Sequence, residues 1–277
     1  MVAPFPDRPS RFVESPDGTP IAMFSAGVGP ALVLVHGTTA DHRTWRVLGP
    51  MLVDRFAIHA IDRRGRGDSG DGGDPYSIAL ELDDLATVAD VLAGESGAAV
   101  DVLGHSLGGR IALGATLRTP SIRRVIAYES APSSVLRAPG ARDELLEGLR
   151  GDLARADNDT LLARFMTEAV GMPAADLAAF RADPIWPLRA AAAPTIVREL
   201  DAADAAPEIS LESLSVVGVP VLQVAGSESP DSFREAASVL DARLVDGRLA
   251  IIDGARHAAH HSHPAELLAL VEDFLAR

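Results

Sequence analysis

Six short apolar runs constrain the fold of this chain more than any other feature. Each is long enough for one strand, and most are separated by segments whose apolar residues recur at three- and four-residue steps. The runs are ALVLVH, FAIHAID, AAVDVLGH, IRRVIAYE, VPVLQVAG and RLAIID. Strands that are apolar on both faces are typical of a parallel sheet covered by helices on both sides. The sequence therefore predicts an α/β fold, and RFVES and IAMFSA add a hairpin around Pro16-Asp17-Gly18.

The segment from about residue 131 to residue 214 departs from this alternation. It contains several helical patterns and no convincing strand, and it lies between two of the apolar runs. Ligands bind at the carboxyl edge of open α/β sheets. We therefore expect this segment to lie over that edge as a helical cap. The predicted domains are a core of residues 1–130 and 215–277 and a cap of residues 131–214.

Composition excludes several classes of function. The formal net charge is −14, which opposes binding to nucleic acid or to an anionic membrane. The absence of cysteine excludes disulfides, thiolate catalysis and cysteine-based metal sites. The N-terminal residues do not resemble a secretory signal, and no apolar run is long enough to cross a bilayer. We expect a cytoplasmic protein without nucleic-acid or membrane partners; its oligomeric state is left open.

One short motif indicates a nucleophile. Residues 104–109 read GHSLGG and contain the pattern G-x-S-x-G between a predicted strand and a predicted helix. Small residues at positions 104 and 108 permit the sharp turn that exposes Ser106. The pattern alone is weak in a chain of this length, but its place between strand and helix makes it specific. We therefore predict that Ser106 is the nucleophile.

Two further groups are expected to work with this serine. His36-Gly37-Thr38 follows an apolar run, and we predict that the backbone N–H groups of Thr38 and Leu107 form an oxyanion hole. The ring of His36 is expected to be buried and bonded to backbone.

The predicted general base is His257, the first of four histidines that follow the last apolar run. The other three, His260, His261 and His263, lie closer to the final predicted helix, where histidine is commonly found at the surface or at a helix cap.

Together these features resemble the α/β-hydrolase superfamily. The resemblance rests on LVLVHGT, IDRRGRGDS, GHSLGG and DGARHAAHHSHPAELLALVEDFL, in this order, and covers nearly all of the chain except the predicted cap. It implies a mostly parallel eight-stranded sheet with helices on both faces and a cap insertion. It also implies a serine–acid–histidine triad that needs neither a metal nor an organic cofactor. The arginines of the second motif, Arg63, Arg64 and Arg66, are interpreted as parts of a structural turn.

The acid of this triad departs from the family pattern. The usual position, three residues after the glycine of VPVLQVAG, holds Ser229, whose hydroxyl has no charge to stabilise a histidinium. Glu129 ends the run IRRVIAYE, 23 positions after Ser106. A minority of the superfamily, including zearalenone-type lactone hydrolases and some haloalkane dehalogenases, places the acid there. We predict Glu129 as the acid, with Asp231, Glu228 or no functional acid as the alternatives.

The predicted function is hydrolysis of a small-molecule carboxylic ester or lactone through an acyl-enzyme on Ser106. A perhydrolase, a thioesterase and a carbon–carbon bond hydrolase use the same triad and are alternatives. A non-catalytic homologue that binds a small ligand is the rival from another class, and only the missing aspartate at position 229 favours it. The residues predicted to contact substrate are large and apolar: Trp45, Phe165, Met166, Met172 and Trp186.

Overall fold

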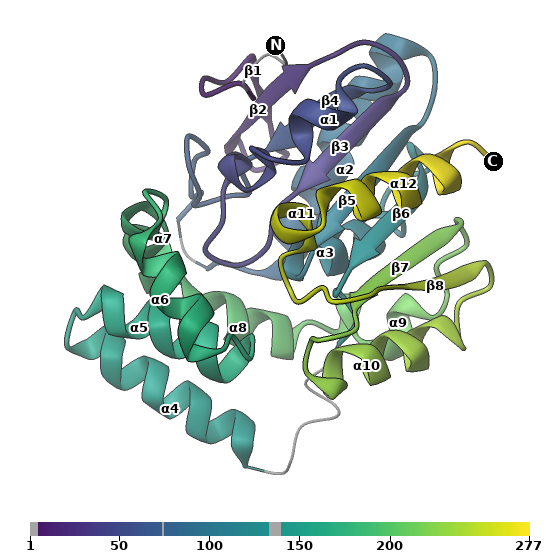
Figure 1. The fold of residues 1–277 in the computed structure, drawn as a ribbon. Coiled ribbons are helices and arrows are strands. Elements are labelled where there is room, and N and C mark those ends of the chain that lie inside the picture. The colour runs from purple at the N-terminus through teal and green to yellow at the C-terminus, as the bar shows by residue number, and fades with distance from the viewer. Residues whose placement is uncertain (1–4, 74, 133–139) are drawn as a thin grey trace.

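The core of the protein is one twisted sheet of eight strands in the order β1-β2-β4-β3-β5-β6-β7-β8 (Figure 1). The structure is a computed structural model that describes residues 5–73, 75–132 and 140–277. β1 pairs antiparallel with β2, and β2 with β4, whereas all other neighbours are parallel. The predicted mostly parallel sheet and its N-terminal hairpin are therefore confirmed. The strands are β1 Arg11–Glu14, β2 Pro20–Ala26, β3 Ala31–Val35, β4 Ala57–Ile61, β5 Val100–His105, β6 Ile122–Tyr128, β7 Val221–Gly226 and β8 Gly247–Ile252.

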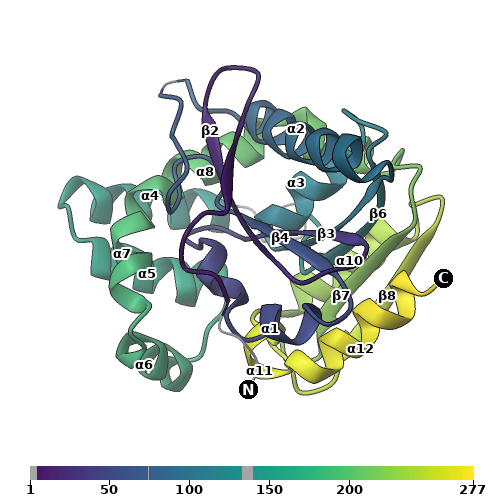
Figure 2. The same ribbon diagram turned by 90° about the horizontal axis from the view of Figure 1, so that it is seen from above.

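Helices cover both faces of the sheet. In Figure 2, α2 and α3 lie on one side of the strands and α1 and α12 on the other. Alternate residues of one strand serve the two sides: Val33 and Val35 pack with α2 and α3, whereas Leu32 and Leu34 pack with α1 and α12. The helices of the core are η1 His42–Trp45, α1 Gly49–Leu52, α2 Ile78–Ser96, α3 Leu107–Ala115, α10 Asp231–Asp241, α11 Ala259–Ser262 and α12 Pro264–Leu275.

The described part of the segment between β6 and β7 is helical. Its helices α4 to α8 lie together beside one end of the sheet (Figure 1), and they share an apolar cluster that includes Leu149, Leu161, Phe165 and Ile196. Residues 133–139 of the predicted cap lie outside the described residues. The helices are α4 Ala141–Ala154, α5 Asn158–Arg164, η3 Phe165–Ala169, α6 Ala174–Ala182, α7 Trp186–Ala192, η4 Ala193–Thr195, α8 Ile196–Ala205, η5 Pro207–Ile209 and α9 Leu211–Leu214.

The strand order decides where functional residues can meet. β3, β5, β6, β7 and β8 are consecutive neighbours and run parallel. Their carboxyl ends therefore lie at the same edge of the sheet, and residues that directly follow these strands gather there. Within the described residues, no helix combines the length and the apolar character needed to cross a lipid bilayer.

Candidate active site

Ser106 occupies a strained turn between β5 and α3. It is the single residue between the two elements, and its backbone has φ 54° and ψ −126°. A non-glycine residue at positive φ costs on the order of 1–3 kcal/mol and persists only where the surrounding structure holds it. The amide of Ser106 donates a hydrogen bond to the carbonyl of Tyr128 at 2.9 Å, which fixes the turn to the end of β6. This is the strand-to-helix turn expected for an exposed nucleophile.

Glycine is required on both sides of this serine. A Cβ at position 104 would overlap the backbone of Gly109, and a Cβ at position 108 would overlap the carbonyl oxygens of Val35 and His36. The first helical turn of α3 therefore packs directly on the end of β3. The close approach explains why the motif admits only the smallest residue at these two positions.

Replacing Gly108 with alanine is expected to lower the free energy of unfolding by about 1–3 kcal/mol, because backbone atoms must move to admit the methyl group. Gly94→Ala is the matched control: it lies in α2, and a Cβ there meets no atom within 4 Å. Its higher helix propensity predicts a protein at least as stable as the wild type. Urea denaturation of the two variants measures the difference, and equal midpoints would contradict the packing argument.

His257 and Glu129 form a hydrogen-bonded pair at the same edge. The Nδ1–H of His257 donates to Oε2 of Glu129 at 2.6 Å, and the backbone N–H of Gly226 donates to the other carboxylate oxygen at 2.9 Å. The Glu129 side chain is fully buried, and its backbone has φ +47°. Both carboxylate oxygens thus have donors. Because Nδ1 carries the proton that faces Glu129, Nε2 is the ring nitrogen left free to accept another proton.

Two residues that the sequence did not identify hold the loop of His257. The Nε2–H of His105 donates to the carbonyl oxygen of His257 at 2.7 Å, and the hydroxyl of Tyr128 donates to the carbonyl of Arg256. Burial lowers the pKa of His105 well below its ordinary value, so the ring is neutral. His105 and Tyr128 are the last residues of their strands, and each directly precedes a predicted site residue. The sequence does not indicate that they bond to the loop of His257.

The alternative acids are engaged elsewhere. Asp231 pairs with Arg234, and its side chain is 80% exposed. Glu228 pairs with Arg256 at 2.7 Å and is half exposed. Ser229 is buried, and its hydroxyl has no hydrogen-bond partner among the described residues. Of the three candidate carboxylates, only Glu129 is brought to His257.

The loop after β3 passes close to the nucleophile. A Cβ on Gly37 would lie 3.0 Å from the Cβ of Ser106, and Thr38 and Leu107 line one cavity with Ser106. The Nδ1–H of His36 donates to the carbonyl of Gly37 at 2.9 Å, and its Nε2 accepts the N–H of Arg63 at 3.0 Å. Burial lowers the pKa of His36 well below its ordinary value. The expectation of a buried, backbone-bonded histidine is confirmed.

Two cavities open on Ser106 and His257. The larger has a volume of about 540 Å³ and the smaller of about 100 Å³. Phe165 lines both, and Met166 and Met172 line the larger, as the sequence predicted for the cap. A cavity of several hundred Å³ lined by apolar groups is typical of a small-molecule site.

The two tryptophans predicted to contact substrate lie elsewhere and line neither cavity. Trp45 is 1% exposed and packs among core residues on the α1 and α12 side of the sheet. Trp186 belongs to the apolar cluster of the cap, where its Nε1–H donates to Asp159 at 2.6 Å. Both residues were predicted to contact substrate because they are large and apolar, but in the structure their side chains pack inside apolar clusters. The prediction of substrate contact therefore does not fit their placement.

The arginines of the turn motif are buried and paired. Arg63 donates to Glu81 at 2.7 Å and to Glu199 at 2.9 Å, and Arg66 donates to Glu199 at 2.6 Å. Arg64 is paired with Asp84 at 2.7 Å. Glu199 lies in α8, so this network joins the helical segment to the loop after β4. The contacts support the structural interpretation of these arginines.

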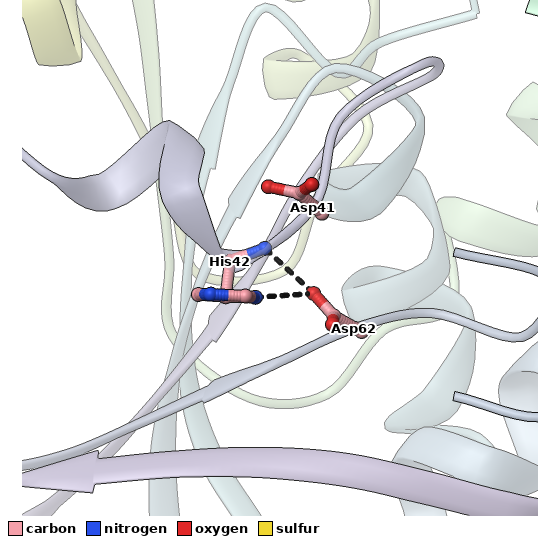
Figure 3. Close-up of side chains that lie close together, drawn as sticks. All are labelled: Asp41, His42 and Asp62. Atoms are coloured by element: carbon pink, nitrogen blue, oxygen red, sulfur yellow. Dashed lines mark hydrogen bonds and ion pairs between the residues drawn. The ribbon is translucent and has the colours of Figure 1, made fainter. Parts of the chain in front are cut away.

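Asp41, His42 and Asp62 form a compact cluster of possible metal ligands (Figure 3). Asp62 accepts the backbone N–H of His42 at 2.7 Å and its Nδ1–H at 2.9 Å. Asp41 accepts the backbone N–H of Arg43 at 2.9 Å and its guanidinium at 2.6 Å. Since protein donors already occupy both carboxylates, we assign the cluster a structural role in the loop after β3.

Comparison with known proteins decides the family. A family model for alpha/beta hydrolases matches residues 32–270. The chain belongs to the alpha/beta hydrolase family. The resemblance seen in the sequence motifs is thereby confirmed.

Several members of the alpha/beta hydrolase family are similar over almost their whole length. A pimeloyl-[acyl-carrier protein] methyl ester esterase from Neisseria meningitidis is 31% identical over 253 residues, which cover 87% of this chain and 91% of that protein. The corresponding esterase from Aeromonas hydrophila is 29% identical and covers 90% and 96%. The crystal structure of an alpha/beta hydrolase from Sphaerobacter thermophilus superposes with a TM-score of 0.75 at 29% identity, covering 93% of this chain and all of that one.

Proposed function

We propose that this alpha/beta hydrolase is a serine hydrolase that cleaves a small-molecule carboxylic ester. The observation that carries the proposal is the hydrogen bond between His257 and the fully buried carboxylate of Glu129. It lies at the cavity that also contains Ser106, whose strained turn exposes its hydroxyl. A serine, an imidazole and a buried carboxylate are the three groups that make up a catalytic triad, in which the serine is activated as a nucleophile.

In the proposed mechanism, Nε2 of His257 takes the proton of the Ser106 hydroxyl as the oxygen attacks the ester carbonyl carbon. The backbone N–H groups of Thr38 and Leu107 hold the resulting oxyanion. The C–O bond to the alcohol then breaks, and the alcohol leaves with the proton from His257. Water attacks the acyl-enzyme with His257 again as base, which releases the acid and restores Ser106. Glu129 orients His257 and stabilises its charged form.

The similar proteins support an ester as substrate. The two relatives named above are methyl ester esterases, and each aligns with about nine tenths of this chain. From these relatives we carry over to this chain only the type of bond cleaved, a carboxylic ester, and not the named substrate. The proposal includes lactones, which the position of Glu129 suggested, because a lactone is a cyclic ester.

A fluorophosphonate probe tests the proposed function directly. We expect stoichiometric labelling of the protein, with the adduct on Ser106 by peptide mass spectrometry, because only an activated serine reacts readily with such a probe. Turnover of a short p-nitrophenyl ester, a thioester and a lactone then ranks the alternatives that share the triad. A protein that stays unlabelled and shows no turnover would instead be a small-ligand-binding homologue.

A further inference from the structure

Arg189, in α7, places a guanidinium on the wall of the larger cavity. It donates one hydrogen bond to the hydroxyl of Thr44 at 3.0 Å. Among the residues that the structure describes, no carboxylate lies within ion-pair distance of it. A cation in such a place without a counter-charge is unusual, because removing it from water is costly unless it is paired.

The other charged groups on the cavity wall are compensated. Arg46 pairs with Asp183 at 2.9 Å, and Arg256 pairs with Asp176 at 2.9 Å and with Glu228 at 2.7 Å. Neither arginine therefore contributes an uncompensated positive charge. Among the arginines and carboxylates that line the cavity, the guanidinium of Arg189 is therefore left in excess.

Two carboxylates act on Arg189 only at longer range. Asp41 and Asp183 both favour its charged form, yet Arg43 occupies the first and Arg46 the second. Burial lowers the pKa of Arg189 to about 10, which still leaves it protonated at neutral pH. The cation is thus permanent, and neither neighbouring carboxylate is free to approach it.

The histidines around it do not add a competing charge. Burial lowers the pKa of His105 and His260 well below their ordinary values and that of His261 to about 4. All three are neutral at pH 7. They line the larger cavity together with Arg189, so these three rings place no positive charge beside its guanidinium.

A short series of contacts connects this guanidinium to the nucleophile. The hydroxyl of Thr44, which accepts from Arg189, lies 3.2 Å from Nε2 of His260. The rings of His260 and His105 have centroids 4.6 Å apart, and His105 directly precedes Ser106. The cation and the serine therefore line one space of about 540 Å³, which is large enough to hold an ester and a second polar group.

We propose that Arg189 binds a free carboxylate carried by the substrate, so that the preferred substrate is an ester of an acid or alcohol that bears one carboxylate. The inference rests on the proposed ester hydrolysis. The planar guanidinium matches a carboxylate through two parallel N–H donors. One guanidinium without an ion-pair partner, on a wall that also carries Asp176 and Asp183, suits a singly charged group better than a phosphate dianion.

The kinetic test compares two substrates that differ only in the distal group. Mono-p-nitrophenyl adipate ends in a carboxylate, and p-nitrophenyl heptanoate ends in an ethyl group instead. We expect the wild type to prefer the adipate monoester in kcat/KM, and Arg189→Gln to lower that preference by about tenfold to a hundredfold, the range of a charge-assisted hydrogen bond. Arg189→Lys, which keeps the charge but loses the fork, should give an intermediate value.

Arg181→Gln is the matched control. This arginine lies in the neighbouring helix α6, pairs with Asp159 at 2.6 Å and lines neither cavity. Arg181→Gln changes the net charge by the same amount as Arg189→Gln but leaves the cavity wall unchanged. Its substrate preference should therefore equal that of the wild type. An adipate-to-heptanoate ratio that is equal in wild type and Arg189→Gln would overturn the proposal while leaving ester hydrolysis intact.

A binding measurement separates this proposal from the proposed function. Isothermal titration of Ser106→Ala protein with adipate needs no turnover. We expect binding that weakens at least about tenfold when Arg189→Gln is added. If no ester is hydrolysed but adipate binds through Arg189, ester hydrolysis fails and the carboxylate site stands. Adipate affinity that does not depend on residue 189 overturns the site.

Discussion

Ser106→Ala is expected to lower kcat/KM for ester hydrolysis by roughly 10⁵- to 10⁶-fold. The variant removes the only oxygen that the proposed mechanism uses to form the acyl-enzyme. The oxyanion donors and the cavity remain, so the residual rate should still exceed that of the reaction in water. The measurement is p-nitrophenol release under saturating enzyme, because steady-state turnover by the variant will be too slow to separate from contaminants.

The effect must be specific to this serine. Ser238→Ala removes a hydroxyl that donates to the carbonyl of Arg234 on the surface helix α10. Its kcat/KM should stay within about twofold of the wild type, as is usual for surface substitutions. Thermal melting of both variants excludes unfolding, and relief of the turn strain at position 106 predicts no loss of stability in Ser106→Ala. Wild-type rates in Ser106→Ala would refute an acyl-enzyme on this residue.

Glu129→Gln is expected to lower kcat by roughly 10⁴-fold with little change in KM. Glutamine keeps the size of the side chain, and its carbonyl oxygen can still accept the N–H of Gly226. Its amide, however, presents an N–H donor to Nδ1 of His257 and thereby favours the tautomer whose Nε2 carries the proton. That tautomer cannot take the proton of Ser106.

Two variants separate this acid from its sequence neighbours. Asp231→Asn and Glu228→Gln remove the carboxylates near the usual family position, and each is expected to change kcat by less than about threefold, since both groups are exposed and pair with arginines. A collapse of activity in Asp231→Asn, with Glu129→Gln near wild type, is the result that would move the acid to the loop after β7.

The fold was predictable because each strand carries its own signal. The runs ALVLVH and IRRVIAYE are apolar on both faces, and the parallel, doubly covered sheet follows from that pattern. The strands also end where the functional residues begin, so Ser106 could be named from its motif between a strand and a helix, and His257 from its place after the last strand. The acid was harder, because Glu129, Glu228 and Asp231 all follow strands that end at one edge. Only the direction of each side chain distinguishes them.

Contacts between residues far apart in the sequence could not be predicted from sequence pattern. Trp45 and Trp186 have the size of substrate contacts, but whether an indole faces a core or a cavity depends on packing between elements. Arg189 carries no motif, and its significance lies in the absence of an ion-pair partner within the described structure. Pairing of charges across the fold is not encoded in local sequence pattern, so this residue emerges only in three dimensions.

The loop after β7 holds Ser229 at the position where the family pattern places the catalytic acid. On the proposed mechanism it supplies no reacting carboxylate, yet Pro230 lines the larger cavity and touches the helical segment at Gly171. On that mechanism, substitution of Pro230 can alter substrate selectivity without removing a group that takes part in bond cleavage. Directed evolution of selectivity would therefore start by randomising this position.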